Sequence, residues 1–519
     1  MSAEQEVFPL TIAEQPVPGP VRSAAATAEG GLPALIQGGM GVGVSGWRLA
    51  RSVARTGQLG VVSGVALDVT LARRLQQGDP GGHLRGALAE FPVPAISERI
   101  LARYYVRDGI EPGAPYRPVP RLGLRPNRAR DELAVVANFA EVFLAKRDGG
   151  TVGINYLEKI QMATPAAAYG AMLAGVDFVL MGAGIPSQIP RLLDRLAAHL
   201  PAEVTVTVAG AEGGERHAVG IDPVALLGRT PEPLVRPRLL AIVSSDVLAG
   251  YLARTPETRP DGFVVEAPVA GGHSAPPRGR MRLDETDQPV YGPRDEVNLA
   301  KVAALGLPFW LAGGYASRDG LARALEAGAA GVQVGTAFAL CRESGLDDKL
   351  RRRLLEQAKD GTLRVRNDPH ASPAGFPFKV AGLPDTLAAP EVHERRPRLC
   401  DLGHLRTPYV KPDGGVGFRC PAEPVDAYLR KGGRLEETEG RRCLCNGLVA
   451  AIGLGQHRPD GYQEPPLLTL GQDLDFLGDL PEGYTAADVV AHLLGPGGAP
   501  GSAGAGEDQR EGGLPPEGS

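Results

Sequence analysis

Two glycine-rich turns in the second half of the chain carry the residue types that bind phosphate. Residues 312–338 read AGGYASRDGLARALEAGAAGVQVGTAF, with one glycine turn after each of two apolar segments. Glycine lets backbone N–H groups come close to an anion, and a helix N-terminus adds positive potential. The order of these features predicts a phosphate site formed by Gly313, Gly314, Gly335 and Thr336. The alternative is an ordinary strand–helix–strand unit with tight turns.

A histidine that follows two glycines is the candidate catalytic residue. His273 comes after Gly271 and Gly272 in the segment EAPVAGGH, which begins at Glu266 and follows an apolar run. Imidazole can transfer a proton near neutral pH, and glycines allow a flat ligand to approach the backbone. The alternative is a loop histidine that is held by a backbone hydrogen bond.

Further candidates follow two other apolar segments. Gly38, Gly39, Met40 and Gly41 offer backbone groups and one soft side chain to a ring system, although a tight turn would explain them equally. Asn155, in VGINYLEKIQ, could donate its amide to a heteroaromatic carbonyl or could cap a loop. Lys159 is near the same end, but a lysine is expected to be solvent-exposed.

The elements that must position these residues alternate between strand and helix. Regular alternation predicts an α/β fold with a parallel sheet, and its eight units favour a TIM (β/α)8 barrel over a doubly wound open sheet. The expected barrel strands are Ala34–Gln37, Leu59–Ser63, Thr151–Asn155, Phe178–Met181, Leu239–Ser244, Gly262–Glu266, Phe309–Ala312 and Gly331–Val334. A further strand, Val204–Val208, is expected to belong to an excursion.

Composition divides the rest of the chain. We expect an N-terminal segment at 1–30, a barrel at 31–361 with an insertion at 64–130 over its mouth, and an extension at 362–495. Residues 496–519 are rich in glycine, proline and charge, which predicts a disordered tail. With 519 residues, the chain is long enough for one large barrel with additions.

Charge and cysteine content exclude several classes. The net charge of −5 gives no support for nucleic-acid binding, and no apolar run is long enough to cross a bilayer. The N-terminus lacks the basic and apolar regions of a secretory signal, and five cysteines suit a reducing compartment, so a cytoplasmic protein is expected. The oligomeric state is left open, a homo-oligomer included.

Four of the cysteines fall in the extension, at Cys400, Cys420, Cys443 and Cys445. Four thiolates can hold zinc or an iron–sulfur cluster. Only one pair is close in sequence, however, and its Cys-Leu-Cys spacing differs from a standard zinc ribbon. Buried apolar cysteines or a redox-sensitive pair are the alternatives. His404 is an alternative ligand but is expected to lie at the surface.

Several segments in order resemble the nitronate monooxygenase (2-nitropropane dioxygenase) family of FMN-dependent barrels. They are IQGGMGVGVSGWRLARSVARTGQLGVVSG, VGIN, AGGH, LAGGYAS and GVQVGTAF, within roughly residues 30–345. The resemblance implies an FMN site. Its ring would be lined by Gly38, Gly39 and Met40 and contacted by Asn155. Gly271 and Gly272 would pass close to the ring, Gly313, Gly314, Gly335 and Thr336 would hold the phosphate, and His273 would act as base or orient the substrate.

The same framework serves flavin-dependent enoyl-thioester reductases, so the resemblance implies the cofactor better than the substrate. Four residues separate Glu266 from Gly271 and Pro276-Pro277 follow His273, and both features depart from the nitronate branch. The leading interpretation is oxidation of a nitronate or nitroalkane by O₂ to a carbonyl compound and nitrite. The alternatives are an NAD(P)H-dependent enoyl-thioester reductase and a non-catalytic flavin-binding assembly protein.

Overall fold

The structure is a computed structural model that describes residues 31–211 and 215–495. The N-terminal segment at 1–30 and the predicted disordered tail at 496–519 lie outside the described residues. None of the helices in the described ranges combines the length and the apolar character that a membrane crossing requires.

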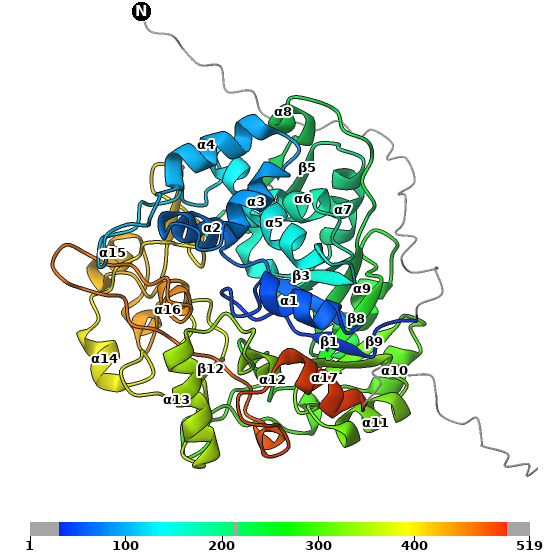
Figure 1. Ribbon diagram of the computed structural model, residues 1–519. Coiled ribbons are helices and arrows are strands. Elements are labelled where there is room, and N and C mark those ends of the chain that lie inside the picture. The colour runs from blue at the N-terminus through cyan, green and yellow to red at the C-terminus, as the bar shows by residue number, and fades with distance from the viewer. Residues whose placement is uncertain (1–30, 212–214, 496–519) are drawn as a thin grey trace, which may run out of the picture.

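Eight parallel strands close into a barrel in the order β1-β10-β9-β8-β7-β4-β3-β2 (Figure 1). The predicted TIM barrel is therefore confirmed, and the open-sheet alternative is wrong. The strands are β1 (Leu35–Gln37), β2 (Leu59–Ser63), β3 (Val152–Leu157), β4 (Phe178–Gly182), β7 (Arg238–Val243), β8 (Gly262–Glu266), β9 (Phe309–Ala312) and β10 (Gly331–Val334). β1 pairs with β10, with Ile36 opposite Gln333, so the last strand closes the ring on the first.

The strands are almost continuous apolar runs because both of their faces are buried. The barrel interior is a compact cluster that includes Ile36, Leu180, Val264 and Trp310. Trp310 is fully buried and donates its indole N–H to the Pro33 carbonyl at 2.8 Å. This bond lies at the amino-terminal end of the barrel strands, opposite the carboxyl-terminal end at which the site is expected.

Helices cover the outside of the barrel, and polar caps begin several of them. The Asn127 side chain accepts from the N–H of Arg130 at the start of α5 (Arg128–Lys146), and Ser317 accepts from Gly320 at the start of α11 (Arg318–Glu326). The remaining barrel helices are α1 (Trp47–Ala54), α6 (Thr164–Leu173), α7 (Ile189–Ala197), α9 (Asp246–Ala253), α10 (Leu299–Ala303), α12 (Thr336–Ala339) and α13 (Asp348–Lys359).

A short excursion separates β4 and β7. The hairpin of β5 (Ala202–Thr205) and β6 (Ala218–Ile221) is antiparallel and separate from the barrel sheet, and α8 (Pro223–Leu227) follows it. The expectation that Val204 lies in an excursion is confirmed, although the strand begins and ends earlier than predicted.

The segment between β2 and α5 folds as three helices, α2 (Leu67–Gln76), α3 (His83–Ala89) and α4 (Pro94–Tyr104). They pack on α5, and their connecting loops contact the extension. The Tyr116 N–H donates to Gln456, and Arg121 donates to the Cys400 carbonyl. Of this segment, Val65 lines the main cavity. The predicted position of the insertion over the barrel mouth stays a prediction.

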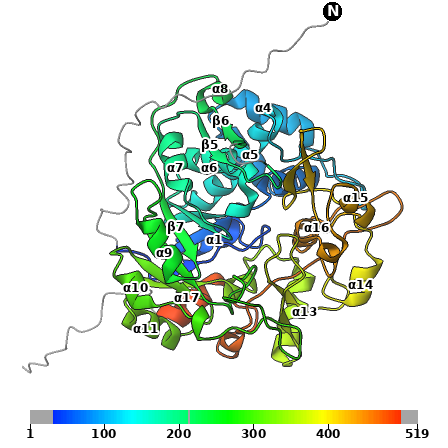
Figure 2. The same cartoon turned by 180° about the vertical axis from the view of Figure 1, so that it is seen from behind.

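The extension curves around one side of the barrel, as both views show (Figures 1 and 2). It contains two hairpins, β11 (Val365–Asp368) with β12 (Phe378–Ala381) and β13 (Thr407–Val410) with β14 (Val416–Arg419). Its helices are α14 (Pro390–Arg395), α15 (Val425–Arg430), α16 (Leu444–Ala450) and α17 (Ala486–Leu494). The last helix packs on α1, α11 and α12, so the chain returns to the barrel at its end.

Candidate active site

A cavity of about 480 Å³ lies at the carboxyl ends of the eight barrel strands. Each strand contributes residues to it, and its lining is largely apolar. The extension supplies a further wall, through Phe376, Phe378, Leu448, Thr469, Leu470, Gly471, Asp473 and Phe476. All of the predicted site residues lie in this lining, namely Gly38, Gly39, Met40, Asn155, Gly271, Gly272, His273, Gly313, Gly314, Gly335 and Thr336. The fold thus places residues that are nearly 300 positions apart in the sequence at one end of the barrel.

The turn after β1 lies directly against Asn155. A Cβ atom at Gly39 would be 2.2 Å from the Asn155 Cβ, so only glycine allows this contact. The Asn155 amide donates to the carbonyls of Tyr156 and Leu180, at 2.9 and 3.2 Å. Its side-chain nitrogen is therefore used within the barrel, which leaves the side-chain oxygen for a ligand, rather than the amide donor that the sequence suggested.

The two glycine turns predicted to bind phosphate line the same end of the cavity. Gly313 and Gly314 have φ of 89° and 78°, the left-handed region that favours glycine. The Thr336 hydroxyl accepts from the Gly471 N–H at 2.8 Å, which leaves its own proton free to be donated. The extension also places a carboxylate here, because the Asp473 Oδ2 is 3.8 Å from the position that a Gly314 Cβ would occupy.

His273 is held by the hairpin of the extension. Its Nε2 is 2.7 Å from the Ser372 hydroxyl, and its ring meets the Phe378 ring edge-on at 4.8 Å between centroids. Burial, and then the nearby charge of Lys159, lower the pKa of His273 well below its usual value. The imidazole is therefore neutral at physiological pH, and it is fixed in orientation from outside the barrel.

Lys159 is the cation of the cavity. Among the described residues that line it, no other lysine and no arginine is present. The Lys159 ammonium is buried without a hydrogen-bond partner and lies 4.2 Å from the centre of the Phe376 ring. Burial lowers the pKa of Lys159 to about 8, although the carboxylate of Glu158 opposes that shift. The expectation of a solvent-exposed lysine is thus wrong.

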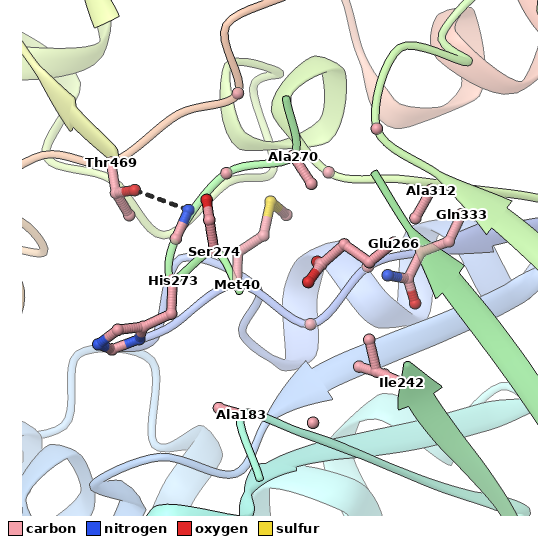
Figure 3. Close-up of a pocket in the computed structure, with 18 of the residues that line it drawn as sticks. Met40, Ala183, Ile242, Glu266, Ala270, His273, Ser274, Ala312, Gln333 and Thr469 are labelled. Atoms are coloured by element: carbon pink, nitrogen blue, oxygen red, sulfur yellow. Dashed lines mark hydrogen bonds between the residues drawn. The ribbon is translucent and has the colours of Figure 1, made fainter. Parts of the chain in front are cut away.

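A second lysine lies beneath the glycine–histidine loop. Lys379 comes from β12, is fully buried, and donates to the Pro268 carbonyl and the Ser274 hydroxyl. Burial raises the pKa of Glu266 to about 7, and Lys379 partly counteracts this. The side chains of Glu266, Gln333 and Met40 extend into the cavity (Figure 3). His273 lies at the other end of the loop that begins at Glu266.

Four residues that form or support the site were not predicted from the sequence. Gln333 is a polar residue within the apolar strand GVQV, and its side-chain oxygen is buried without a partner. Lys379 likewise interrupts the apolar run FPFKV. A polar side chain at a buried strand position is a usable signal, because such a position is costly unless it has a role. Ser372 carries no such signal, and neither does Thr469, whose hydroxyl accepts from the Gly272 N–H.

The extension cysteines are free thiols. Burial raises the pKa of Cys420 and of Cys445 to about 12, so both are protonated at neutral pH. Among residues 31–211 and 215–495, no three His, Cys, Asp or Glu side chains are arranged to hold a metal ion. His404 is buried rather than exposed, with its Nε2 4.0 Å from Asp68.

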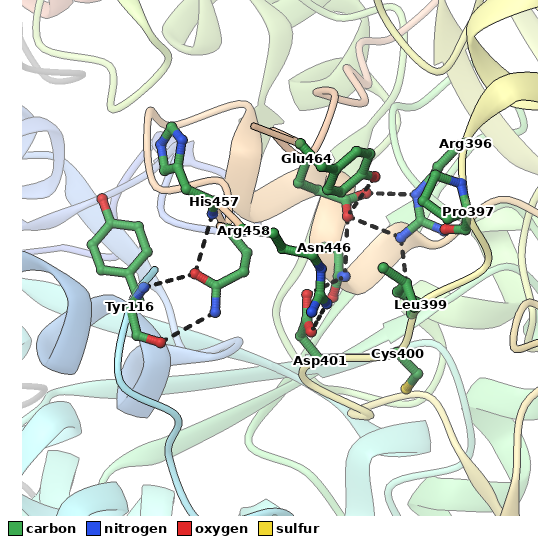
Figure 4. Close-up of polar contacts among 12 residues, drawn as sticks. Tyr116, Arg396, Pro397, Leu399, Cys400, Asp401, Asn446, His457, Arg458 and Glu464 are labelled. Atoms are coloured by element: carbon green, nitrogen blue, oxygen red, sulfur yellow. Dashed lines mark hydrogen bonds and ion pairs between the residues drawn. The ribbon is translucent and has the colours of Figure 1, made fainter. Parts of the chain in front are cut away.

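A polar network lies deep in the extension, next to Cys400 (Figure 4). Arg396 forms a two-point ion pair with Glu464, at 2.6 and 3.0 Å, and the two side chains are 3% and 0% exposed. Asn446 joins Glu464 to Asp401, which also pairs with Arg458 at 2.6 Å. This network fixes the extension internally and does not reach the cavity.

The comparisons with known proteins agree with this geometry. Residues 240–369 match the family model of nitronate monooxygenase, a stretch that contains both AGGH and GVQVGTAF. A nitronate monooxygenase of Paraburkholderia phytofirmans is 38% identical over 98 residues, 19% of this chain and 25% of the relative. The second half of the barrel therefore matches the model of this family, and the predicted resemblance is confirmed.

A longer match is to a relative that is named for a different activity. The (3aS,4S,5R,7aS)-5-hydroxy-7a-methyl-1-oxo-octahydro-1H-indene-4-carboxyl-CoA dehydrogenase of Mycobacterium tuberculosis is 30% identical over 220 residues, 39% of this chain. The match spans 59% of that relative, less than two thirds of its length. The solved structure of FabK from Thermotoga maritima aligns over 89% of this chain and 91% of its own, with 16% identity and a TM-score of 0.43. The two curated relatives, a dehydrogenase and a monooxygenase, are both oxidoreductases, the class that the sequence predicted.

Proposed function

We propose that this protein is a flavin-dependent oxidoreductase that binds FMN and oxidises a small nitronate. The observation that carries the proposal is the convergence, in one cavity, of the glycine turns after β1, β9 and β10 with His273. Phosphate sites in (β/α)8 barrels are often formed after the last two strands, which here are β9 and β10. The family match over residues 240–369 supports the same class.

The residues present fit a flavin. Gly39 lets the turn after β1 pack directly against Asn155, and both residues line the cavity in which a flat ring would lie. The buried and unpaired oxygen of Gln333 lacks a donor that a ring N–H would supply. The turns at Gly313, Gly314, Gly335 and Thr336 would hold the phosphate, whereas Met40, Gly271 and Gly272 would line the ring.

Bound FMN would supply the two-electron acceptor, and the chain would supply position and charge. His273 is neutral and held by Ser372, so it can orient a substrate oxygen without repelling or neutralising it. A strongly lowered pKa also makes it a weak base. Orientation of a preformed nitronate therefore suits this histidine better than abstraction of a carbon-bound proton. The apolar walls and the extension exclude water from the reacting carbon.

The test is the visible spectrum of the purified protein under anaerobic conditions, before and after addition of ethylnitronate. The proposal expects an oxidised flavin spectrum that the nitronate bleaches and that air restores with release of nitrite. A protein that holds no flavin, and that free FMN does not reconstitute, would refute the class. Flavin that the nitronate leaves unchanged would refute the substrate alone.

A second candidate is oxidoreduction of an acyl thioester, with NAD(P)H as the reductant for an enoyl substrate. The relative from M. tuberculosis, which is named for a carboxyl-CoA substrate, favours it. A second cavity of about 700 Å³ meets the main one at Glu266, Val269, Ala312 and Tyr315 and provides space for a longer substrate. Consumption of NAD(P)H with an enoyl-CoA would support this candidate, and bound flavin that neither substrate reduces would favour a non-catalytic flavin protein.

A further inference from the structure

The cavity contains a positive charge that no protein group neutralises by a hydrogen bond. The Lys159 ammonium is buried, is unpaired within the described chain, and lines the cavity together with His273. Its neighbours are the Phe376 ring, at 4.2 Å, and Glu158, whose carboxylate bonds to Gln161 at 2.7 Å. A buried ammonium without a partner is costly, so its retention in a functional cavity indicates a ligand that completes it.

The position of Lys159 separates this charge from the phosphate turns. Lys159 follows β3. Its ammonium lies over the ring of Phe376, a residue of the extension, and its charge contributes to lowering the pKa of His273. The phosphate turns follow β9 and β10, across the barrel, where the nearby charged group is Asp473. The cation therefore serves the substrate end of the cavity rather than the cofactor phosphate.

We propose that Lys159 is the docking group for the substrate, and that the substrate is the planar conjugate base of a carbon acid, with its negative charge delocalised onto oxygen. The ammonium binds that oxygen directly while His273 contacts the same group from the other side. Nitronates have this chemistry, as do the enolate forms of acyl thioesters. The inference rests on the proposed flavin site, and it names the residue that would bind the oxyanion common to both candidate substrates.

The Lys159 ammonium is positioned by the Phe376 ring. Phe376 lies in the loop between β11 and β12, the hairpin that also supplies Ser372 to His273. One element of the extension thus orients both groups that would contact the oxyanion. The attraction between a cation and a ring face offsets part of the desolvation of the ammonium and holds it in place.

The experiment compares holoenzymes of the wild type, Lys159→Met, and Lys301→Met as a control at an exposed lysine on α10. Nitrite, an unreactive planar oxyanion, is titrated while the flavin spectrum reports its binding. The proposal expects full flavin content in all three and an increase of at least tenfold in the nitrite dissociation constant for Lys159→Met alone. An unchanged dissociation constant in that variant would overturn the proposal.

Two further measurements separate the outcomes. The melting temperature of Lys159→Met should equal or exceed that of the wild type, because the substitution removes an unpaired buried charge. If Lys159→Met fails to fold, Lys159→Gln takes its place in the experiment. The Michaelis constants for ethylnitronate and for an acyl-CoA thioester then identify the source of the oxyanion, because Lys159→Met should raise only that of the true substrate class. A wild-type protein that binds no flavin would refute the proposed function. If the protein binds flavin but Lys159→Met binds nitrite as tightly as the wild type does, this inference alone is refuted.

Discussion

At the scale of single residues, the site combines groups whose protonation is shifted away from solution behaviour. His273 and Lys159 lose part of their affinity for protons because both are buried, and Glu266 gains affinity for the same reason. Around neutral pH the cavity therefore holds a neutral imidazole, a mostly charged ammonium and a carboxyl group near its midpoint. Such shifts are typical of functional sites.

Replacement of His273 tests its role. His273→Asn should keep FMN bound and lower kcat/KM for ethylnitronate by about 10–100-fold, the loss of one oriented hydrogen bond to a charged oxygen. The loss should be similar for neutral nitroethane if His273 orients the substrate. A much larger loss for the neutral substrate would instead assign it as the base. His370→Asn, at an exposed histidine of the same hairpin loop, should leave both rates unchanged.

Glu266 gives a prediction about pH and stability. Its folded pKa, about 7, is above the ordinary value of 4.5, so the folded state binds more protons than the unfolded state between these two values. Stability from this group therefore falls as pH rises through that window. Glu266→Gln removes the effect, and its free energy of unfolding relative to the wild type should increase by about 1–3 kcal/mol from pH 4.5 to pH 8. Urea unfolding at several pH values measures it.

The exposed carboxylate Glu326 supplies the control for that experiment. Glu326→Gln should differ from the wild type by less than about 0.5 kcal/mol at every pH. A Glu266→Gln difference that stays flat with pH would contradict the raised pKa.

At the scale of elements, the segment 468–476 of the extension lies across the phosphate turns. Gly471 bonds to Thr336, Thr469 accepts from the Gly272 N–H at 3.0 Å, and Asp473 approaches Gly314. The first contact holds a predicted phosphate turn and the second holds the glycine–histidine loop, whereas the carboxylate would repel a phosphate group. The extension would therefore both shape the proposed cofactor site and limit its affinity.

Removal of that repulsion should tighten cofactor binding. Asp473→Asn keeps the side-chain oxygen that accepts from the Asp475 N–H, but it eliminates the negative charge. The dissociation constant of FMN should fall several-fold, and the difference should shrink at high salt because the charges are screened. Flavin fluorescence titration of the apoprotein measures it. Asp475→Asn, at an exposed neighbour, should have no effect, and weaker binding by Asp473→Asn would show that the carboxylate supports the site.

The sequence predicted the barrel elements well because their signals are local. Strands β2, β8, β9 and β10 begin and end at the predicted residues, since each is an apolar run bounded by polar or glycine residues. The glycine turns and His273 were predicted for the same reason. Lys159, Ser372 and Thr469 were not, because their roles depend on the extension folding back over the mouth. Local patterns contain no information about that long-range contact.

At the scale of the whole molecule, the extension is stabilised internally by a buried ion pair and externally by the barrel. The Arg396–Glu464 pair is nearly inaccessible to solvent, and the insertion loops add contacts from the other side. The helices of the insertion pack on α5, and the loops of the insertion contact the extension. The cavity depends on the extension as well as on the strands.

Disruption of the Arg396–Glu464 ion pair should therefore also weaken flavin binding at the active site. Arg396→Met leaves the buried Glu464 carboxylate without its partner and should destabilise the protein by about 3–5 kcal/mol. Flavin should be released at the same urea concentration that unfolds the extension. Arg396→Met combined with Glu464→Leu should recover part of the loss, because no charge remains unpaired. Arg434→Met, at an exposed pair, should cost less than about 1 kcal/mol, and an equal effect of both single variants would contradict this account.

The hydrogen bond from Gly471 to Thr336 joins positions 135 residues apart, and this separation has a consequence for synthesis. A ribosome adds about 5–20 residues per second, so all eight strands emerge roughly 7–27 seconds before the segment that covers their turns. During that interval a nascent barrel presents an uncovered mouth, through which a cofactor can enter freely. Once translation has passed the segment, exchange requires its displacement, and flavin supply during expression then determines how much of the protein is loaded.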